Sequence, residues 1–548
     1  MVDSSKPTRT EEEREAMRRA VEARAAAERP ALPVEPPAQL TESLVIRCER
    51  ENYLGDAKIY AHLHRDQVLY VLTTEKWLAW AGHHWRPDIG GKQALAKVED
   101  VAQEYLRIVG ILRARKEDPK VEDEEKKILD DNISSLLARA KRLRGTTRKE
   151  VINYCHSGEA SLAISGDELD ANPWLLGTSN GVLDLRTLEH RPGRPDDYIT
   201  RTTAVEWQGL EADAAPFMNF LSDILDENEL DVAFMLRFLG MALYAGQREH
   251  KFLVLYGEGG RNGKDTLMSI LGDVLGGDLC SPVPPEMLME QPFVRDYSKP
   301  SPEIMSLRGK RIIHASETSK RHRFDAETVK RITGGGREKA RGLMENNMSQ
   351  WERTHTLIML CNDLPAAPPD DEAFWDRLYG IPLVRRFVDD PDSDPGKKEF
   401  KKNPDLREQM RSCGPGILAA LAKGFLDYLQ NGLNPSPNST SFREKYRKEE
   451  DTVARFLDEC CTLHEDREAG KTQNSELYDC YYWWFSVNIS RKVYLNARGF
   501  SAAMKKKGFE VRKISSNHYM GVTIEPGAAA AWAAWKDEKK GRGGKRDE

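Results

Sequence analysis

The stretch from Phe252 to Leu267, FLVLYGEGGRNGKDTL, constrains the fold of this chain more than any other part of its sequence. A run of β-branched and aromatic residues leads into a glycine-rich loop, and Lys264 then opens a helical segment. A strand, a loop and a helix in this order are typical of a phosphate-binding loop, in which backbone N–H groups and the helix N-terminus surround phosphate oxygens. The alternation of β-rich runs with helices around it predicts an α/β core with a largely parallel sheet.

Eight residues of this loop and of the following helical turn are candidates for contacts with a nucleotide and its metal ion. The lysine reaches the terminal phosphates, and the glycines let backbone N–H groups turn inward. The candidates are Gly257, Gly259, Gly260, Asn262, Gly263, Lys264, Asp265 and Thr266.

The loop departs from the usual spacing in two ways. Five residues separate Gly257 from Gly263 where the usual pattern has four, so either the loop has an extra residue or Glu258 takes the first glycine position. Asp265 stands where Ser or Thr normally binds Mg²⁺, and Thr266 follows it. We expect either Thr266 to take that role or Asp265 to supply a carboxylate.

Two further apolar runs end in polar residues that suit the same chemistry. RIIHASE ends at Glu317, and TLIMLCN ends at Asn362. ATP hydrolysis by P-loop ATPases needs a carboxylate that supports the metal and orients the attacking water. Glu317 is the candidate acid and a third candidate metal-binding residue. Asn362 is placed to contact the γ-phosphate or the water if its strand lies between the other two.

With these motifs, the chain resembles the superfamily III helicases of phages, plasmids and large DNA viruses, in the phage/plasmid primase C-terminal (poxvirus-like primase-helicase) group. The resemblance covers roughly residues 44–525, nearly all of the chain. It is carried by GRNGKDT, RGKRIIHASETSK, FDAETVKRITGGG, LIMLCNDLP and DEAFWDRLYGIPLVRRF, and upstream by WLLGTSNGVLDLRTLEHRPGRPDDYITR and GDAKIYAHLHRDQVLYVLTTEKWLAWAGHHW.

The resemblance implies roles for single residues. Lys264 corresponds to the phosphate-binding lysine, Glu317 to the catalytic acid and Asn362 to the sensor of the third motif. The family implies a ring, usually a hexamer, in which ATP and Mg²⁺ bind at subunit boundaries and a neighbour's arginine completes the site. Arg377 stands at the position of that arginine, with Arg385 and Arg386 as alternatives.

The segment Ile332 to Asn347 resembles the family's hairpin that projects into the ring channel. Its basic residues Arg337, Lys339 and Arg341 suit contacts with a phosphate backbone without reading sequence. Gly336 replaces an acid that is common in the family. Without the resemblance, a charged exposed loop would more simply be solvated.

We expect five regions along the chain, with a multidomain α/β fold built around an AAA+-like P-loop ATPase. An aromatic-rich helix, a basic stretch with Lys505, Lys506 and Lys507, and a β-like ending predict a C-terminal winged helix that binds DNA or docks a protein. The regions are a charged and Pro-rich tail at 1–40, a largely helical N-terminal region at 41–215, the ATPase at 216–435, the winged helix at 441–524 and a charged tail at 525–548.

Composition excludes several classes of protein. The net charge of −6 argues against a chain that coats DNA through bulk positive charge, although a ring can keep basic residues on its inner face. Eight scattered cysteines without a CxxC pair indicate a reducing compartment and no structural zinc. No apolar run approaches the length of about 20 residues that spans a bilayer, and the N-terminus lacks a signal-peptide pattern. We expect a cytoplasmic protein without a membrane partner.

The sequence therefore favours an ATP-dependent helicase that acts as a ring on single-stranded and forked DNA in phage or plasmid replication. One alternative is a replication initiator or assembly ATPase that binds DNA and uses ATP as a switch. Another is a primase-helicase. Priming requires paired carboxylates on a strand, and no Asp-x-Asp lies on an apolar strand in the first 215 residues. A separate primase is the better expectation.

Overall fold

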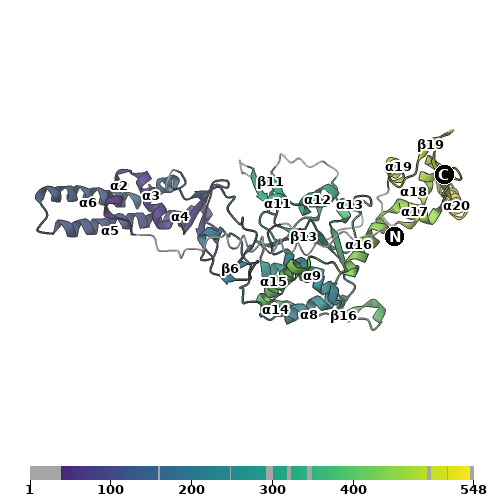
Figure 1. Ribbon diagram of the computed structural model, residues 1–548, viewed down its shortest axis with the longest axis horizontal. Helices are drawn as coiled ribbons and strands as arrows, with labels where there is room; N and C mark the ends of the chain where they lie inside the picture. The colour runs from purple at the N-terminus through teal and green to yellow at the C-terminus, as the bar shows by residue number, and fades with distance from the viewer. Residues whose placement is uncertain are drawn as a thin grey trace.

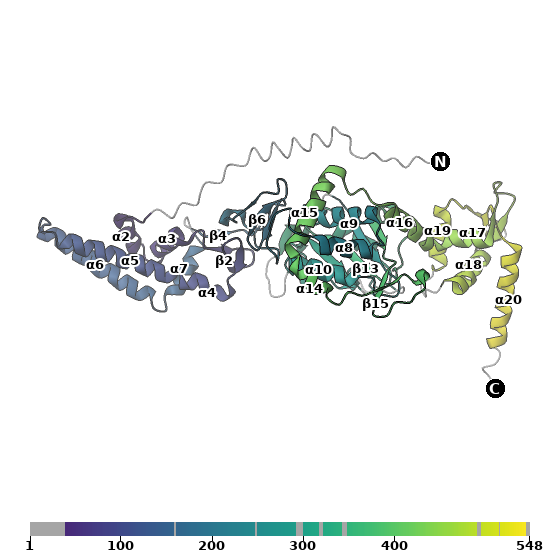
Figure 2. The ribbon, with the colours of Figure 1, turned by 90° about the horizontal axis from the view of Figure 1, so that it is seen from below.

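The computed structural model describes residues 39–157, 161–246, 249–291, 300–316, 322–341, 348–489, 495–514 and 516–543. The molecule is elongated, with a helical arm at one end, an α/β body in the middle and a small α/β unit at the other end (Figures 1 and 2). Among these described residues, no helix is both long and apolar enough to cross a membrane. The fold is mixed α/β with a helical N-terminal region, as the sequence predicts.

The arm is built on two long antiparallel helices, α5 (Val98–Lys116) and α6 (Asp123–Leu143), which pack along their length. Apolar residues recur every three or four positions in both, so each helix buries one stripe and exposes a charged face. Shorter helices cover the inner half of this pair. They are α2 (Glu42–Arg50), α3 (Tyr53–His64), α4 (Lys92–Ala96) and α7 (Arg148–Cys155).

A buried ion pair ties α6 to α3 inside the arm. Arg139 donates from Nε to Asp56 Oδ1 at 3.1 Å and pairs through Nη2 with the other carboxylate oxygen. The hydroxyl of Tyr105, on α5, donates to the same carboxylate at 2.7 Å. Both charged side chains are buried. The ion pair joins α3 to α6, and the neutral hydroxyl of Tyr105 adds α5. Each charge of the pair stabilises the other, because an unpaired buried charge is costly.

Two small sheets connect the arm to the body. The first has the order β3-β2-β1-β4 and the second the order β5-β6-β7. Their strands are β1 (Val68–Val71), β2 (Lys76–Trp80), β3 (Trp85–Pro87), β4 (Ala163–Ile164), β5 (Leu175–Thr178), β6 (Gly181–Asp184) and β7 (His190–Arg191).

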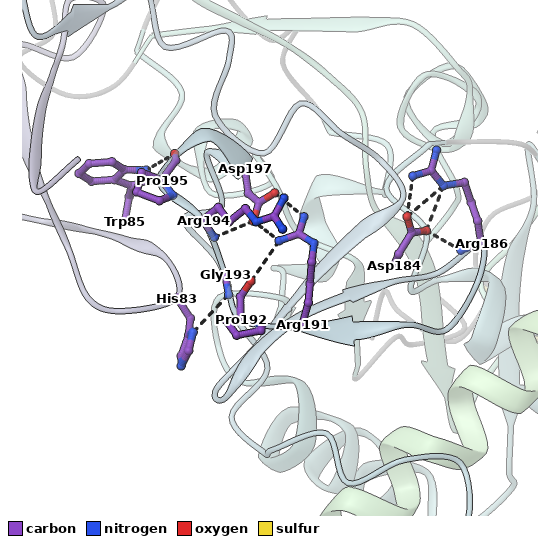
Figure 3. Close-up of polar contacts among 10 residues, drawn as sticks. All are labelled: His83, Trp85, Asp184, Arg186, Arg191, Pro192, Gly193, Arg194, Pro195 and Asp197. Atoms are coloured by element: carbon purple, nitrogen blue, oxygen red, sulfur yellow. Dashed lines mark hydrogen bonds and ion pairs between the residues drawn. The ribbon is translucent and has the colours of Figure 1, made fainter. Parts of the chain in front are cut away.

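The contact between these two sheets depends on Gly193 (Figure 3). Its N–H donates to His83 Nδ1 at 3.2 Å, and the indole N–H of Trp85 donates to Pro195 O at 2.9 Å. A Cβ at position 193 would lie 2.2 Å from the carbonyl oxygen of His83, so only glycine allows this close approach. Trp85 is buried at this contact and is part of the core.

The body contains a five-stranded sheet with the order β14-β8-β13-β10-β9, and every neighbouring pair is parallel. The predicted parallel sheet is therefore confirmed. Its strands are β8 (Phe252–Tyr256), β9 (Cys280–Pro282), β10 (Ile312–Ala315), β13 (Thr356–Cys361) and β14 (Leu378–Pro382).

Helices cover both faces of this sheet, and alternate strand residues feed two separate cores. In β8, Leu253 and Leu255 join one core, while Phe252 and Val254 join the other. The first core includes residues of α8 (Ala215–Ile224), α9 (Glu229–Met241), α10 (Lys264–Leu275), α14 (Leu406–Ser412) and α15 (Gly414–Asn431). The second includes residues of α11 (Pro302–Met305), α12 (Ala326–Thr333) and α13 (Glu372–Trp375).

Two short strand pairs project from the body. β11 (Arg337–Ala340) pairs antiparallel with β12 (Ser349–Glu352). β15 (Arg386–Val388) pairs parallel with β16 (Glu399–Lys401). The residues between these two strands are rich in Pro and Asp, a composition that does not by itself predict strand pairing.

The boundary expected between the ATPase and the last region, at residues 435–441, is wrong. Helix α16 (Pro437–Glu450) begins inside the expected linker and packs on the edge strand β14. Phe442 and Tyr446 belong to the second core of the body. Pro437 starts the helix because its fixed φ and missing N–H suit the first turn, so the Pro- and Ser-rich composition marks a helix start.

The C-terminal unit follows α16 directly and has its own aromatic core. Its sheets have the orders β17-β21 and β18-β20-β19. Its elements are α17 (Thr452–Cys460), β17 (Cys461–Leu463), β18 (Lys471–Gln473), α18 (Asn474–Asn488), α19 (Ala497–Lys506), β19 (Val511–Lys513), β20 (Asn517–Met520) and β21 (Val522–Ile524).

The charged tail expected from residue 525 onward is also corrected. Residues Pro526–Gly543 form helix α20, which packs against α18. Trp532 is buried in the core of the C-terminal unit, with Trp535 partly buried against it. The alanine-rich spacing between these tryptophans favours a helix, and the two indoles supply the apolar contact that holds it.

We predict that Arg139→Ala destabilises the arm by about 3–5 kcal/mol, because Asp56 would be left as an unpaired buried charge. Hydrogen exchange of the amides in α3 and α6 of the full chain is the measurement, and it should show faster exchange in both helices. Arg144→Ala is the control, since Arg144 forms an exposed ion pair with Glu99 at 2.7 Å and should cost no more than about 1 kcal/mol. Equal protection in wild type and Arg139→Ala would contradict the prediction.

Candidate functional site

Three loops meet at the carboxyl edge of the central sheet. They follow the adjacent strands β14, β8 and β13, and backbone hydrogen bonds tie them together. The N–H of Gly257 donates to Cys361 O at 3.0 Å, and the N–H of Leu383 donates to Tyr256 O at 2.6 Å. The carboxyl edge of an open parallel sheet is the usual place for a ligand site, and here it carries the glycine-rich loop.

Lys264, the first residue of α10, is the centre of this arrangement. Its Nζ donates to Gly257 O at 2.9 Å, to Asn262 Oδ1 at 3.2 Å and to Asn362 Oδ1 at 3.0 Å. The side chain is 4% exposed, and burial lowers the pKa of its ammonium group, an effect that the nearby carboxylate of Asp265 opposes. All three hydrogen-bond acceptors of Lys264 are neutral oxygens. No carboxylate in the part of the chain that the structure describes is bonded to the ammonium group, so an anionic ligand can pair with it.

Gly257 lies where no side chain fits. A Cβ there would lie 2.5 Å from Asn262 Oδ1 and 2.7 Å from Lys264 Nζ. Glu258, the alternative for the first glycine position, is exposed. The close packing around the lysine therefore assigns the first position to Gly257 and makes the loop one residue longer than usual.

The extra residue is accommodated by three consecutive left-handed conformations. Gly259, Gly260 and Arg261 have φ values of 73°, 72° and 60°. Left-handed backbone is unfavourable for arginine, and Arg261 is held in it by its carbonyl oxygen, which accepts the N–H of Phe387 at 2.8 Å. The loop conformation thus depends on the segment that follows β14.

Gly263 ends the loop and caps α10 with φ 83°, and α8 packs directly against it. Asp265 and Thr266 follow in the first turn of the helix, the former exposed and the latter half-buried. Mg²⁺ usually retains several waters and takes one or two protein ligands together with substrate oxygens. Both residues lie in the turn that follows the loop, and the binding of Mg²⁺ by either of them stays a prediction.

Asn262 has a position that the sequence does not reveal. Its amide nitrogen donates to Leu383 O at 3.1 Å and to Arg385 O at 2.9 Å, while its oxygen accepts from Lys264. The side chain is buried. It therefore points into the protein and holds the loop to the segment after β14, and only its backbone remains available to a ligand. No local pattern could have found this partner more than a hundred residues away.

Asn362 follows β13, which lies between β8 and β10. The predicted strand order is thus confirmed, and it brings the amide of Asn362 to Lys264, while its contact with a phosphate or water stays a prediction. Glu317, the candidate acid, lies outside the described residues. Burial lowers the pKa of His314 on β10, three residues before Glu317, and the carboxylate of Asp265 opposes this effect.

The three candidate arginines lie at different places. Arg377 precedes β14 at the amino edge of the sheet, and its Nη1 donates to Ala373 O at 2.7 Å. Among the described residues it makes no ion pair, and Asp371 caps α13 and pairs with Lys330 at 3.0 Å. A strand of five residues spans roughly 16 Å, so Arg377 cannot reach the loop of its own chain.

Arg385 and Arg386 follow β14 at the carboxyl edge. Arg385 is buried, and it donates to Asp226 and Glu227 at 2.8 Å each. Its guanidinium also lies 4.3 Å from the ring centroid of Phe400. These contacts occupy Arg385 within its own chain. Arg386 pairs with Glu399 at 2.9 Å and lies beside the glycine-rich loop.

The candidate DNA hairpin is present as the β11–β12 pair, although residues 342–347 lie outside the described part of the chain. Arg337 and Lys339 are exposed on one face, and Arg337 pairs with Glu352 at 2.8 Å. Arg341 is half-buried. The opposite face carries Glu338, which is buried.

Two arginines hold Glu338 and so fix the hairpin to α12. Arg331, on α12, pairs with Glu338 at 2.6 Å, and Arg353, after β12, pairs with it at 2.8 Å. Arg353 also donates to Gly334 O and Gly335 O at 3.1 Å each. The base of the hairpin is therefore rigidly attached to the helix before it.

The three candidate DNA-binding lysines of the C-terminal unit differ in their surroundings. Lys505 is exposed at the end of α19. Lys506 pairs with Asp370 of the body at 3.3 Å, and Lys507 pairs with Asp451. Two of the three charges are thus partly neutralised by acids of the same chain, which are distant in sequence.

Comparison with known proteins places these features in a family context. Residues 57–226 match the family described as "D5 N terminal like". A protein of Acanthamoeba polyphaga mimivirus named "Putative helicase" is 28% identical over 433 residues, which cover 76% of this chain and 44% of the relative. A protein of African swine fever virus named "Putative primase" is 28% identical over 343 residues, covering 60% of this chain and 35% of the relative.

The chain thus spans about half or less of the length of these relatives. Among solved structures, the apo C terminal region of NrS-1 aligns with 84% of this chain and 96% of its own length, at a TM-score of 0.46 and 12% identity. The sequence relatives and the D5 match confirm the resemblance to the viral D5-like group of superfamily III helicases.

We predict that Gly257→Ala weakens binding of a fluorescent ATP analogue by about tenfold or more. The new methyl group would displace the ammonium of Lys264, and a hydrogen bond to a charged group contributes roughly 1.5–3 kcal/mol. Gly272→Ala on α10, where a Cβ meets nothing within 4 Å, is the matched control and should bind like wild type. If Gly257→Ala also binds like wild type, the packing around Lys264 does not determine affinity.

Proposed function

We propose that this relative of viral D5-type proteins is an ATP-dependent DNA helicase that works as a ring in the replication of a virus, phage or plasmid. The observation that carries the proposal is the position of Lys264. Its buried ammonium sits at the N-terminus of α10 and bonds to neutral oxygens, with Asn362 at 3.0 Å from the adjacent strand. A buried cation at a helix N-terminus is suited to the phosphates of a nucleotide.

The chemistry assigned to the chain is hydrolysis of the terminal phosphoanhydride of ATP. Lys264 neutralises charge on the phosphates, and Asn362 contacts the terminal phosphate or the attacking water. Glu317 orients that water. Thr266 or Asp265 holds Mg²⁺, which when bound offsets the charge that develops on the phosphate oxygens.

A ring accounts for the separation between Arg377 and the phosphate loop. Arg377 lies at the edge of the sheet opposite Gly257 and Lys264, so it can serve only the site of a neighbouring subunit. Its Nε lacks a hydrogen-bond partner among the described residues, and its Nη1 bonds to a backbone carbonyl. A guanidinium without an ion pair is available to stabilise transition-state charge in trans.

Single-stranded DNA is assigned to the β11–β12 hairpin, through Arg337 and Lys339 on its exposed face and Arg341 beyond it. These residues suit backbone contacts without base reading. We assign a winged-helix role to the C-terminal unit, in which α19 and the basic stretch around Lys505 contact DNA. The order of helices followed by the β19–β20 pair supports that assignment.

We predict that single-stranded DNA stimulates steady-state ATP hydrolysis and that Lys264→Ala lowers the rate on the order of 100-fold, as loss of a preorganised charge in an active site does. An ATP-dependent unwinding assay on a forked duplex then separates a helicase from an ATP-switched initiator. Hydrolysis and DNA binding without strand separation would favour the switch. Hydrolysis that survives in Lys264→Ala would contradict the assigned site.

We predict that Arg377→Ala binds ATP nearly as well as wild type but hydrolyses it roughly 10³-fold more slowly, the effect expected for an arginine acting in trans. Mixing Arg377→Ala with Lys264→Ala subunits should restore part of the activity, because some boundaries then combine an intact Lys264 with an intact Arg377. Arg407→Ala, which removes an exposed arginine on α14, is the control. Absence of any recovery in the mixture would place the finger elsewhere.

A further inference from the structure

The segment that follows β14 runs alongside the phosphate loop, and four hydrogen bonds join it to that loop and to the end of β8. Backbone hydrogen bonds join Leu383 to Tyr256 and Phe387 to Arg261, at 2.6 and 2.8 Å. The side chain of Asn262 donates to the carbonyls of Leu383 and Arg385. The backbone of residues 383–387 is therefore held in place beside the loop.

Arg385 and Arg386 leave this segment in different directions. Arg385 is neutralised by Asp226 and Glu227 and packs on Phe400, so it serves the fold. Arg386 turns to the loop, where its Nε lies 3.9 Å from the position of a Cβ on Gly259. A side chain at position 259 would therefore contact the guanidinium, which places Arg386 beside the glycine-rich loop.

The guanidinium of Arg386 is only partly satisfied. Nη1 donates to Glu399 Oε1 at 2.9 Å, across the β15–β16 pair in which these two residues face each other. Nε is buried and has no hydrogen-bond partner among the described residues. The side chain as a whole is 39% exposed, so a ligand has access to it. An N–H group shielded from water and left without an acceptor is costly unless a ligand supplies one.

We propose that Arg386 binds a phosphate of the nucleotide held in the loop of its own subunit, and that Glu399 orients it for this contact. This inference rests on the proposed nucleotide site and adds a second cation to it. A planar guanidinium can donate to Glu399 from one edge and to a phosphate oxygen from another, which an ammonium group cannot do with fixed geometry.

Arg377 and Arg386, which the sequence leaves as alternatives for the arginine that completes a neighbour's site, thereby have different roles. Arg377 lies at the amino edge and acts on the neighbour's site, whereas Arg386 lies at the carboxyl edge and acts on its own. Arg386 should therefore affect nucleotide affinity, and its loss should not be repaired by another subunit. A simple surface ion pair with Glu399 would change neither property.

The test is equilibrium binding of a fluorescent ATP analogue to the full chain, followed by its displacement with inorganic tripolyphosphate. Arg386→Gln should weaken both the analogue and tripolyphosphate by about tenfold, equivalent to about 1.4 kcal/mol. Arg386→Lys should recover part of the affinity through its charge. Lys402→Ala is the matched control, because Lys402 pairs with Asp389 at 2.7 Å in the same region, and it should bind both ligands like wild type.

The binding measurements distinguish a wrong role for Arg386 from a wrong nucleotide site. Binding by wild type and Arg386→Gln with equal affinity overturns the role of Arg386 and leaves the nucleotide site standing. Weaker binding of the analogue with unchanged displacement by tripolyphosphate also overturns it, since the contact would then be with the base or sugar. If wild type and Lys264→Ala both fail to bind the analogue, the proposed function itself is wrong.

A mixing experiment tests the same-subunit assignment. Arg386→Gln combined with Lys264→Ala subunits should show no more hydrolysis than the two variants measured apart, whereas Arg377→Ala combined with Lys264→Ala should recover activity. Recovery in the Arg386→Gln mixture would show that Arg386 acts across the subunit boundary and would overturn the inference.

Discussion

The hydrogen bonds of Asn262 are the constraint on which the candidate site depends. One buried amide joins the phosphate loop, the lysine at the start of α10 and the segment that follows β14. A long, glycine-rich loop has high conformational entropy when free, and these contacts hold it in a single shape. They explain how a loop with an additional residue still brings Lys264 against Asn362.

Among the described residues, the same packing leaves Lys264 without an acid in direct contact. Its three hydrogen-bond acceptors are one backbone carbonyl and two side-chain amides. Burial lowers the pKa of Lys264, because the neutral form is favoured when the charge is removed from water. A bound phosphate would act in the opposite direction. An anionic ligand would therefore balance the charge of Lys264. The charge of Arg385, by contrast, is balanced within the protein by Asp226 and Glu227.

Helix α12 connects the amino edge of the sheet with the candidate DNA hairpin. Lys330 pairs with Asp371, the cap of the helix that precedes Arg377, and its neighbour Arg331 pairs with Glu338 in the hairpin. The hairpin and the candidate finger are thus attached to consecutive residues of one helix. In the C-terminal unit, acids partly neutralise Lys506 and Lys507, so DNA would have to compete with Asp370 and Asp451 for these lysines.

The sequence by itself determined the strand, loop and helix around Lys264, the parallel sheet and the helical character of the N-terminal region, because glycine spacing and apolar periodicity act over short stretches of chain. Only the tertiary structure decided that Asn262 points inward, that Arg377 and Arg386 lie at opposite edges of the sheet, and that α16 belongs to the body. Each of these depends on a partner about sixty to more than a hundred residues away. Local patterns carry no information about such partners, since the contacts exist only once the sheet has brought distant strands together.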